Sequence, residues 1–142
     1  MSPGPFQDPG AGWALQTAIV AHLKSDATLK ALIGDPPRVI DGPSRTKIFP
    51  FVSIDETRET PLGPAPGHVE HDIRMSVHSR YEGRREAKDI ATALVSVLNE
   101  APLSLDGRRL VSLRAVYTDV IHRTDADAHQ GVLRFRAVTE KI

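Results

Sequence analysis

The chain has 142 residues, a length typical of one domain that buries a single core without disulfides or metals. Lys and Arg number 18 and Asp and Glu number 18, so the formal net charge is zero and no overall field attracts nucleic acid or an anionic membrane. The chain has no cysteine, which excludes disulfide frameworks, thiolate metal sites and cysteine nucleophiles.

The first twelve residues differ in composition from the rest. Residues 1–12 are rich in proline and glycine, which remove backbone donors and lower helix propensity. We therefore expect a flexible arm at 1–12 and a single domain over 13–142. The start lacks the basic region and apolar core of a secretory signal, and no apolar run reaches the roughly 20 residues of a membrane span. The expectation is synthesis in the cytoplasm without membrane contact.

Two helices are predicted at the start of the domain. Between residues 13 and 24, apolar side chains recur every fourth position, at Leu15, Ile19 and Leu23. This period is typical of a helix with one buried face. Asp26 can cap a second, short helix over 27–33, and Gly34 can end it in the left-handed conformation.

Strands follow these helices. A short strand is predicted at 38–40 and a longer one at 49–57, where Val52 and Ile54 alternate with polar residues. Residues 58–67 show neither period and contain three prolines, so they predict a loop. The clearest strand covers about 69–81, because apolar and polar residues alternate along it.

The second half begins with a helix after Gly83, whose apolar stripe comprises Ala87, Ile90, Ala91, Leu94 and Leu98. Asp106-Gly107 is typical of a two-residue type I′ hairpin turn. Two strands at about 110–122 and 131–139 can pair antiparallel through the polar linker 123–128, and the last one buries Leu133, Phe135 and Ala137. This order predicts an α+β fold, with a mainly antiparallel sheet of about four to six strands packed against two or three helices.

Four side chains able to bind metals are close together in the sequence: His122, Asp125, Asp127 and His129. Their spacing matches no known metal template and aspartate is common in turns, so we interpret the segment as a solvated hairpin loop. A metal-binding module is the alternative interpretation. The sequence contains no Gly-x-Ser-x-Gly elbow and no phosphate-binding glycine loop. Catalysis is therefore not predicted, and no cofactor is expected.

Six segments, taken together in order and spacing, resemble one known family. They are Ala14–Ile19, Leu32–Gly34, Phe49–Ile54, Val77–Ala87, Ala101–Leu103 and His129–Ala137. In these segments the chain is similar to the tail-terminator, or tail-completion, proteins of siphophages and gene transfer agents, formerly a domain family of unknown function. The likeness covers nearly the whole chain beyond the arm. It departs from the family at His78, where a tryptophan is common.

The resemblance implies a structural subunit of a phage or phage-like particle, made in the bacterial cytoplasm and assembled into the tail or neck. Six copies would form a ring that caps the head-proximal end of the tail tube, ends its polymerisation and binds neck proteins, while DNA passes through without specific binding. Another head–tail joining role is the alternative. Our hypothesis is that two loops contact neighbouring subunits or the tube, through Arg58, Glu59, Leu62, Arg123, Asp125 and Asp127.

Overall fold

A computed structural model describes residues 10–42, 48–64, 67–124 and 127–142 of the chain. The helices are α1 (Gly10–Lys24), α2 (Ala27–Ile33) and α3 (Arg85–Leu98). The strands are β1 (Val39–Asp41), β2 (Phe51–Pro61), β3 (Val69–Ser79), β4 (Arg108–Arg123) and β5 (Ala128–Lys141). They form one sheet of order β1-β2-β3-β5-β4, antiparallel except for the pairing of β1 with β2. The predicted α+β class is confirmed.

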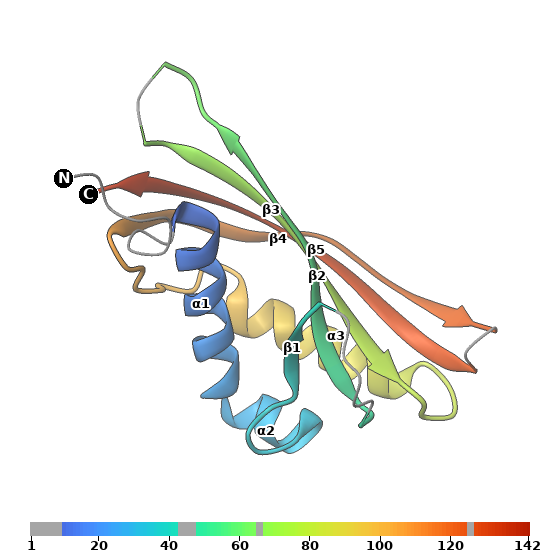
Figure 1. Ribbon diagram of the computed structural model, residues 1–142. Helices are drawn as coiled ribbons and strands as arrows, with labels where there is room; N and C mark the ends of the chain where they lie inside the picture. The colour runs from blue at the N-terminus through green and yellow to red at the C-terminus, as the bar shows by residue number, and fades with distance from the viewer. Residues whose placement is uncertain (1–9, 43–47, 65–66, 125–126) are drawn as a thin grey trace.

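The core lies between the three helices and one face of the sheet (Figure 1). Side chains that alternate along β3 and β5 meet the apolar stripe of α3, and Met75, Leu94 and Phe135 are fully buried there. The buried rows predicted for α3 and the last strand are confirmed. The other face of the sheet, which we call the outer face, carries no helix in the described part of the chain.

The first helix begins earlier than the sequence predicts. Residues 10–12 belong to α1, so this part of the expected arm is wrong, and residues 1–9 lie outside the described residues. Gly10 begins this helix with a φ of 78°, a left-handed conformation that glycine adopts without a clash of a β-carbon. In α2 the predicted cap is confirmed, since Asp26 Oδ2 accepts a hydrogen bond of 3.0 Å from the backbone N–H of Leu29.

Strand β2 continues through residues predicted to form a loop. Residues 58–61 pair one by one with β3, ending at Pro61 opposite Val69, so the loop prediction holds only beyond Pro61. Proline is accommodated because no strand of the described residues lies on the other side of β2 there, so no ladder hydrogen bond is lost. A register shift at Ile54/Glu56 marks a β-bulge where β2 leaves β1.

The C-terminal hairpin is longer and tighter than predicted. β4 and β5 pair from Arg108 opposite Lys141 to Arg123 opposite Ala128, so the two end residues of the expected linker 123–128 belong to strands. The predicted turn at Asp106-Gly107 lies between the bridged residues Leu105 and Arg108. Its type is not I′, since only its glycine has a positive φ, of 71°.

Candidate assembly surfaces

The residues predicted to make assembly contacts lie at opposite ends of the sheet (Figure 1). Arg58, Glu59 and Leu62 belong to the β2–β3 hairpin, whereas Arg123 and Asp127 belong to the β4–β5 hairpin. Asp125 lies outside the described residues. The structure therefore does not bring the two groups together in one chain. The two groups can contact each other only if they belong to two different chains. Otherwise each group would contact a different partner.

At the β2–β3 hairpin, Arg58 and Glu59 are exposed and point to opposite faces of the sheet. Arg58 lies on the outer face opposite Asp72, and Glu59 faces α1 opposite His71. A Cβ atom on Gly12 would lie 2.9 Å from Cδ of Glu59, so the carboxylate rests against the first turn of α1. A negative charge is favourable at that helix end. Glu59 thus already has a role within the chain.

At the β4–β5 hairpin, two histidines lie side by side. His122 and His129 are paired across the strands, with ring centroids 4.8 Å apart. Arg123 donates a hydrogen bond of 2.8 Å to Oε1 of Gln130, and Asp127 is exposed in the turn with a φ of 46°. Within the described residues no group of three His, Cys, Asp or Glu side chains is arranged to hold a metal ion. His122 and His129 belong to strands and not to the loop, so the loop interpretation is limited to the residues between Arg123 and Ala128 and stays a prediction.

On the outer face the structure assembles a polar cluster that sequence reasoning missed: Ser53, Asp55, Ser76 and His78. Asp55 accepts hydrogen bonds from the hydroxyls of Ser53, at 2.7 Å, and Ser76, at 2.5 Å. Nε2 of His78 lies 2.9 Å from Oγ of Ser53. Because a hydroxyl has one proton and Ser53 gives it to Asp55, His78 is the donor in this contact. His78 therefore cannot activate Ser53 as a base, and the cluster is not a catalytic triad.

A second polar network lies where the β2–β3 hairpin and the start of β4 meet the C-terminal end of β5. Nε2 of His71 lies 2.8 Å from Oγ1 of Thr139, which also accepts a hydrogen bond of 3.0 Å from Arg108. Arg108 further donates to the carbonyl oxygen of Gly67 at 2.6 Å. Burial lowers the pKa of His71, and the positive charge of Arg108 lowers it further, while Glu59 acts in the opposite direction. His71 is therefore a neutral, structural side chain.

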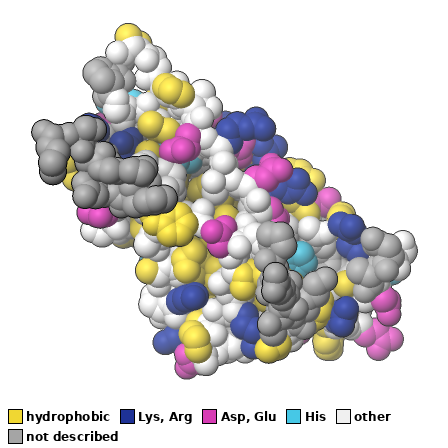
Figure 2. Space-filling view, in the orientation of Figure 1, with side chains coloured by type: hydrophobic (Ala, Val, Ile, Leu, Met, Phe, Trp, Pro, Cys, Tyr) yellow, Lys and Arg dark blue, Asp and Glu magenta, His cyan; other side chains and the backbone are white. Residues whose placement is uncertain are grey.

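Charges on the outer face are mixed in sign. Arg134 pairs with Asp72 at 2.6 Å and Arg136 with Glu70 at 3.6 Å, both between β5 and β3. Figure 2 likewise shows basic and acidic side chains interspersed on the visible surface. Exposed pairs of this kind contribute little to stability. Their effect is to leave no broad field of one sign on this face.

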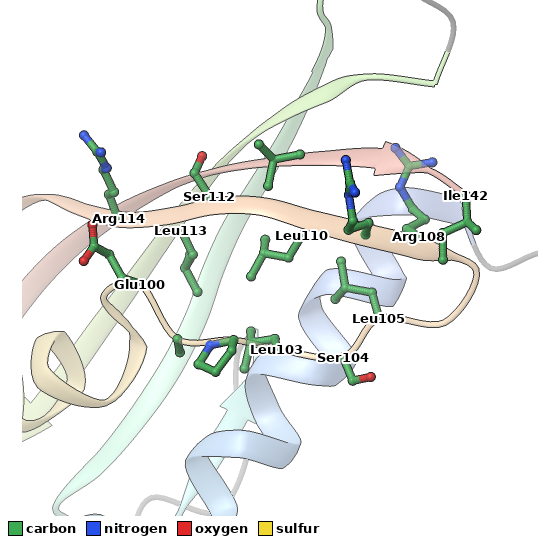
Figure 3. Close-up of a pocket in the computed structure, with 14 residues that line it drawn as sticks. Glu100, Leu103, Ser104, Leu105, Arg108, Leu110, Ser112, Leu113, Arg114 and Ile142 are labelled. Atoms are coloured by element: carbon green, nitrogen blue, oxygen red, sulfur yellow. The ribbon is translucent and has the colours of Figure 1, made fainter.

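Strand β4 is the most open part of the molecule. It lies at the edge of the sheet, and among the exposed large apolar side chains four belong to it: Val111, Val116, Tyr117 and Ile121. A hollow lies between its first half and the loop after α3, lined by leucines and rimmed by Arg108, Arg109 and Arg114 (Figure 3). Two further hollows flank its second half, one against α3 and one across the outer face. An open edge strand is a template for pairing with another chain.

None of the described helices has the length and apolar character needed to cross a lipid bilayer.

The family model described as Tail completion protein gp17 matches residues 17–140. A solved chain from the structure titled "Virion of native gene transfer agent (GTA) particle" is 30% identical, with a TM-score of 0.83, and the match covers 94% of this chain and 99% of that one. No curated protein gives a match. Because the family model spans most of its length, the chain belongs to the Tail completion protein gp17 family.

Proposed function

We propose that this chain is a structural, non-catalytic virion protein that forms a hexameric ring at the head-proximal end of a tail tube. The ring ends tube polymerisation and connects the tail to the neck of a phage or phage-like particle. The observation that carries the proposal is the family match over residues 17–140. The likeness to a chain of a gene transfer agent virion, over nearly the full length of both chains, supports it.

The mechanism is geometric. A tube grows because each added ring exposes a docking face for the next, and a terminator matches that face on one side while presenting a different surface on the other. Its closed ring needs heterologous contacts, in which one patch on a subunit meets a different patch on its neighbour. Two hairpins at opposite ends of one rigid sheet, and two different open strand edges, are suitable parts for such contacts.

Balanced charge on the outer face suits a ring through which DNA passes. A strongly basic surface would hold phosphates and release counterions on binding, which would slow transit. The ion pairs of Arg134 with Asp72 and of Arg136 with Glu70 mask part of the basic charge of β5. We therefore expect the protein to bind duplex DNA weakly at physiological salt.

The proposal is tested by growing tail tubes from the tube protein of the same particle with and without this chain. Added chain should narrow the distribution of tube lengths and appear at one tube end in electron micrographs. Bovine albumin at the same concentration is the matched control. Unchanged tube lengths together with absence from tube ends would refute the proposal. Binding to a neck protein without any effect on tube growth would instead identify a head–tail joining protein.

The β2–β3 hairpin provides a more local test. Leu62 is half-buried beyond the end of β2, and its N–H donates to the carbonyl oxygen of His68 at 2.9 Å. The Leu62→Asp variant keeps this backbone bond and places a charge at the end of the hairpin. It should weaken ring or tube assembly with thermal unfolding nearly unchanged. Equal assembly by both proteins would remove this hairpin from the interface.

A further inference from the structure

The second half of β4 has an open edge. In the first half, the segment after α3 covers this edge: the N–H of Glu100 donates to the carbonyl oxygen of Leu113 at 2.7 Å, and Asn99 Oδ1 accepts from the N–H of Ala115 at 3.0 Å. From Val116 onward no strand and no loop of the described chain takes over this role, and the N–H of Val120 instead donates to Oδ1 of its neighbour Asp119 at 2.9 Å. Exposed apolar side chains gather on the same segment, which we call the β4 edge (116–121).

A second open edge lies on the opposite side of the sheet. Strand β1 pairs only with residues 52–54 of β2, and the bulge at Ile54/Glu56 then turns β2 away from it. Over residues 56–61, β2 is bound to β3 on one side and to no strand of the described chain on the other. We call this segment the β2 edge (56–61). Each edge is six residues long, which is a typical strand length.

We infer that the β4 edge of one copy pairs with the β2 edge of the next copy, so that the sheet continues from subunit to subunit around the ring. This inference rests on the proposed ring and names its contact. The successive antiparallel pairings make β4 run opposite to β2 within one chain. A ring axis tilted from the strand direction, as in a β-barrel, keeps β4 of one copy antiparallel to β2 of the next and offsets the copies along the strands. An offset of four residues brings Asp119, which is level with Ser53 within one chain, to the level of Arg58. The two edges therefore meet antiparallel, the arrangement that gives the stronger ladder.

The alternation of faces selects a register. The outer-face residues of the β4 edge are Tyr117, Asp119 and Ile121, and those of the β2 edge are Glu56, Arg58 and Thr60. When Asp119 pairs antiparallel with Arg58, the outer-face residues of both edges lie on the same side of the joined sheet along the whole contact. The pairing also places these two opposite charges across from each other. It also sets Tyr117 opposite Thr60. Cross-strand pairs of opposite charge stabilise sheets, and like charges destabilise them.

Charge also argues against the simplest alternative, a two-fold dimer in which β4 pairs with β4. Strand β4 carries four arginines against one aspartate: Arg108, Arg109, Arg114 and Arg123 against Asp119. An antiparallel pair of identical strands brings these arginines toward one another. The β4 edge (116–121) itself carries one charge, Asp119, which faces Arg58 in the proposed register, whereas two β4 edges would bring one aspartate toward another. A second copy's β2 edge is therefore the better electrostatic partner for the β4 edge.

Disulfide trapping tests the contact directly, because the chain has no cysteine of its own. In the proposed register Thr60 and Tyr117 of neighbouring copies lie directly opposite each other, with Cα atoms about 4.5–5.5 Å apart, a separation that a disulfide can span. The T60C/Y117C variant, oxidised in the presence of tail tubes, should form a ladder of covalent oligomers up to six chains. Each single variant, T60C or Y117C, is the matched control and should stay monomeric on a denaturing gel.

The outcomes separate this inference from the proposed function. If T60C/Y117C caps tubes but forms no covalent ladder, the strand pairing is overturned and the proposed capping function still stands. Covalent dimers from Y117C alone would indicate pairing of β4 with β4 and would also overturn it. A chain that neither caps tubes nor forms a ladder would refute the proposed function itself.

Charge reversal gives an independent readout. Both D119R and R58D should weaken ring assembly by about tenfold at low salt, since each sets like charges opposite one another. The double variant D119R/R58D restores opposite charges and should recover most of the loss. Thermal unfolding of each variant checks that the monomer is intact. Additive losses in the double variant would show that the two residues do not face each other.

Discussion

Strands β5 and β4 are neighbours of similar length in one sheet, and they have opposite characters. Along β5 the side chains Leu133, Phe135 and Ala137 are fully buried between α3 and the sheet. Along β4 only Leu113 is buried, and apolar residues such as Val116 face solvent. Burial of a strand is therefore set by its neighbours as much as by its own residues. β5 serves the core of one subunit, and β4 is available to another.

The largest effect expected from this contrast is on folding stability. Phe135→Ala should lower the free energy of unfolding by about 3–5 kcal/mol, because a fully buried ring is lost and a cavity remains. Tyr117→Ala on β4, where the ring is 48% exposed, is the matched control and should cost far less. Urea denaturation of both variants measures the difference. Equal losses would mean that β4 is as deeply packed as β5.

Close packing of β5 against β3 predicts a smaller loss. A Cβ atom at Gly131 would lie 3.1 Å from Cβ of Val77, which cannot turn away as a flexible side chain would. Gly131→Ala should therefore cost about 1–3 kcal/mol through overpacking. Adding Val77→Ala should remove the clash, so that the double variant loses less than the sum of the single losses. A neutral Gly131→Ala would show that the strands can separate slightly.

The network of His71, Thr139 and Arg108 beside the β2–β3 hairpin predicts a dependence on pH. Since burial lowers the pKa of His71 below 6.5, the unfolded chain binds the proton more readily than the folded one. The neutral side chain's stabilising contribution is complete above about pH 6.5 and is lost as the pH falls toward the lower folded pKa. The midpoint temperature of unfolding should decrease as the pH is lowered from about 7.5 to about 5.

The His71→Gln variant should flatten this dependence, because its side chain is neutral at every pH in the range. The exposed His122 at the β4–β5 turn provides the control, and His122→Gln should keep the slope of the unmodified protein. An unchanged slope in His71→Gln would assign the pH dependence to another group.

The smallest effect on stability is expected on the open strand. Val116 is 47% exposed on β4, and Val116→Thr keeps its shape, so the free energy of unfolding should change by less than about 0.5 kcal/mol. The same change should still reduce capping of tail tubes, because it makes the proposed contact more polar. Tube lengths in electron micrographs measure this. Normal capping would show that Val116 lies outside the contact.

Periodicity in the sequence predicts the buried half of this molecule well. The apolar rows of α3 and β5 follow helix and strand periods, and the cap of α2 by Asp26 has a local cause. Proline and glycine misled the prediction at 58–61, because pairing with β3 outweighed the local preference of β2. The start of α1 at Gly10 was missed because glycine lowers helix propensity, which led to the prediction of an arm over residues 10–12.

The surfaces are harder to predict because they depend on long-range pairing. The cluster of Ser53, Asp55, Ser76 and His78 exists only through the register of β2 with β3, which no local pattern specifies. Likewise, the openness of β4 follows from the strand order, in which β5 lies between β3 and β4. The six predicted contact residues were chosen as loop residues. The structure places three of them, Arg58, Glu59 and Arg123, within strands instead.

The position of β5 has a consequence for the making of the protein. β5 is the last strand in the chain, and it lies between β3 and β4 in the interior of the sheet. During translation the apolar stripe of α3 therefore has no complete sheet to pack against until these final residues have left the ribosome. A product truncated before Ala128 lacks the strand that joins β3 to β4. Such fragments leave the apolar stripe of α3 without its β5 partner, which makes them susceptible to cellular proteases.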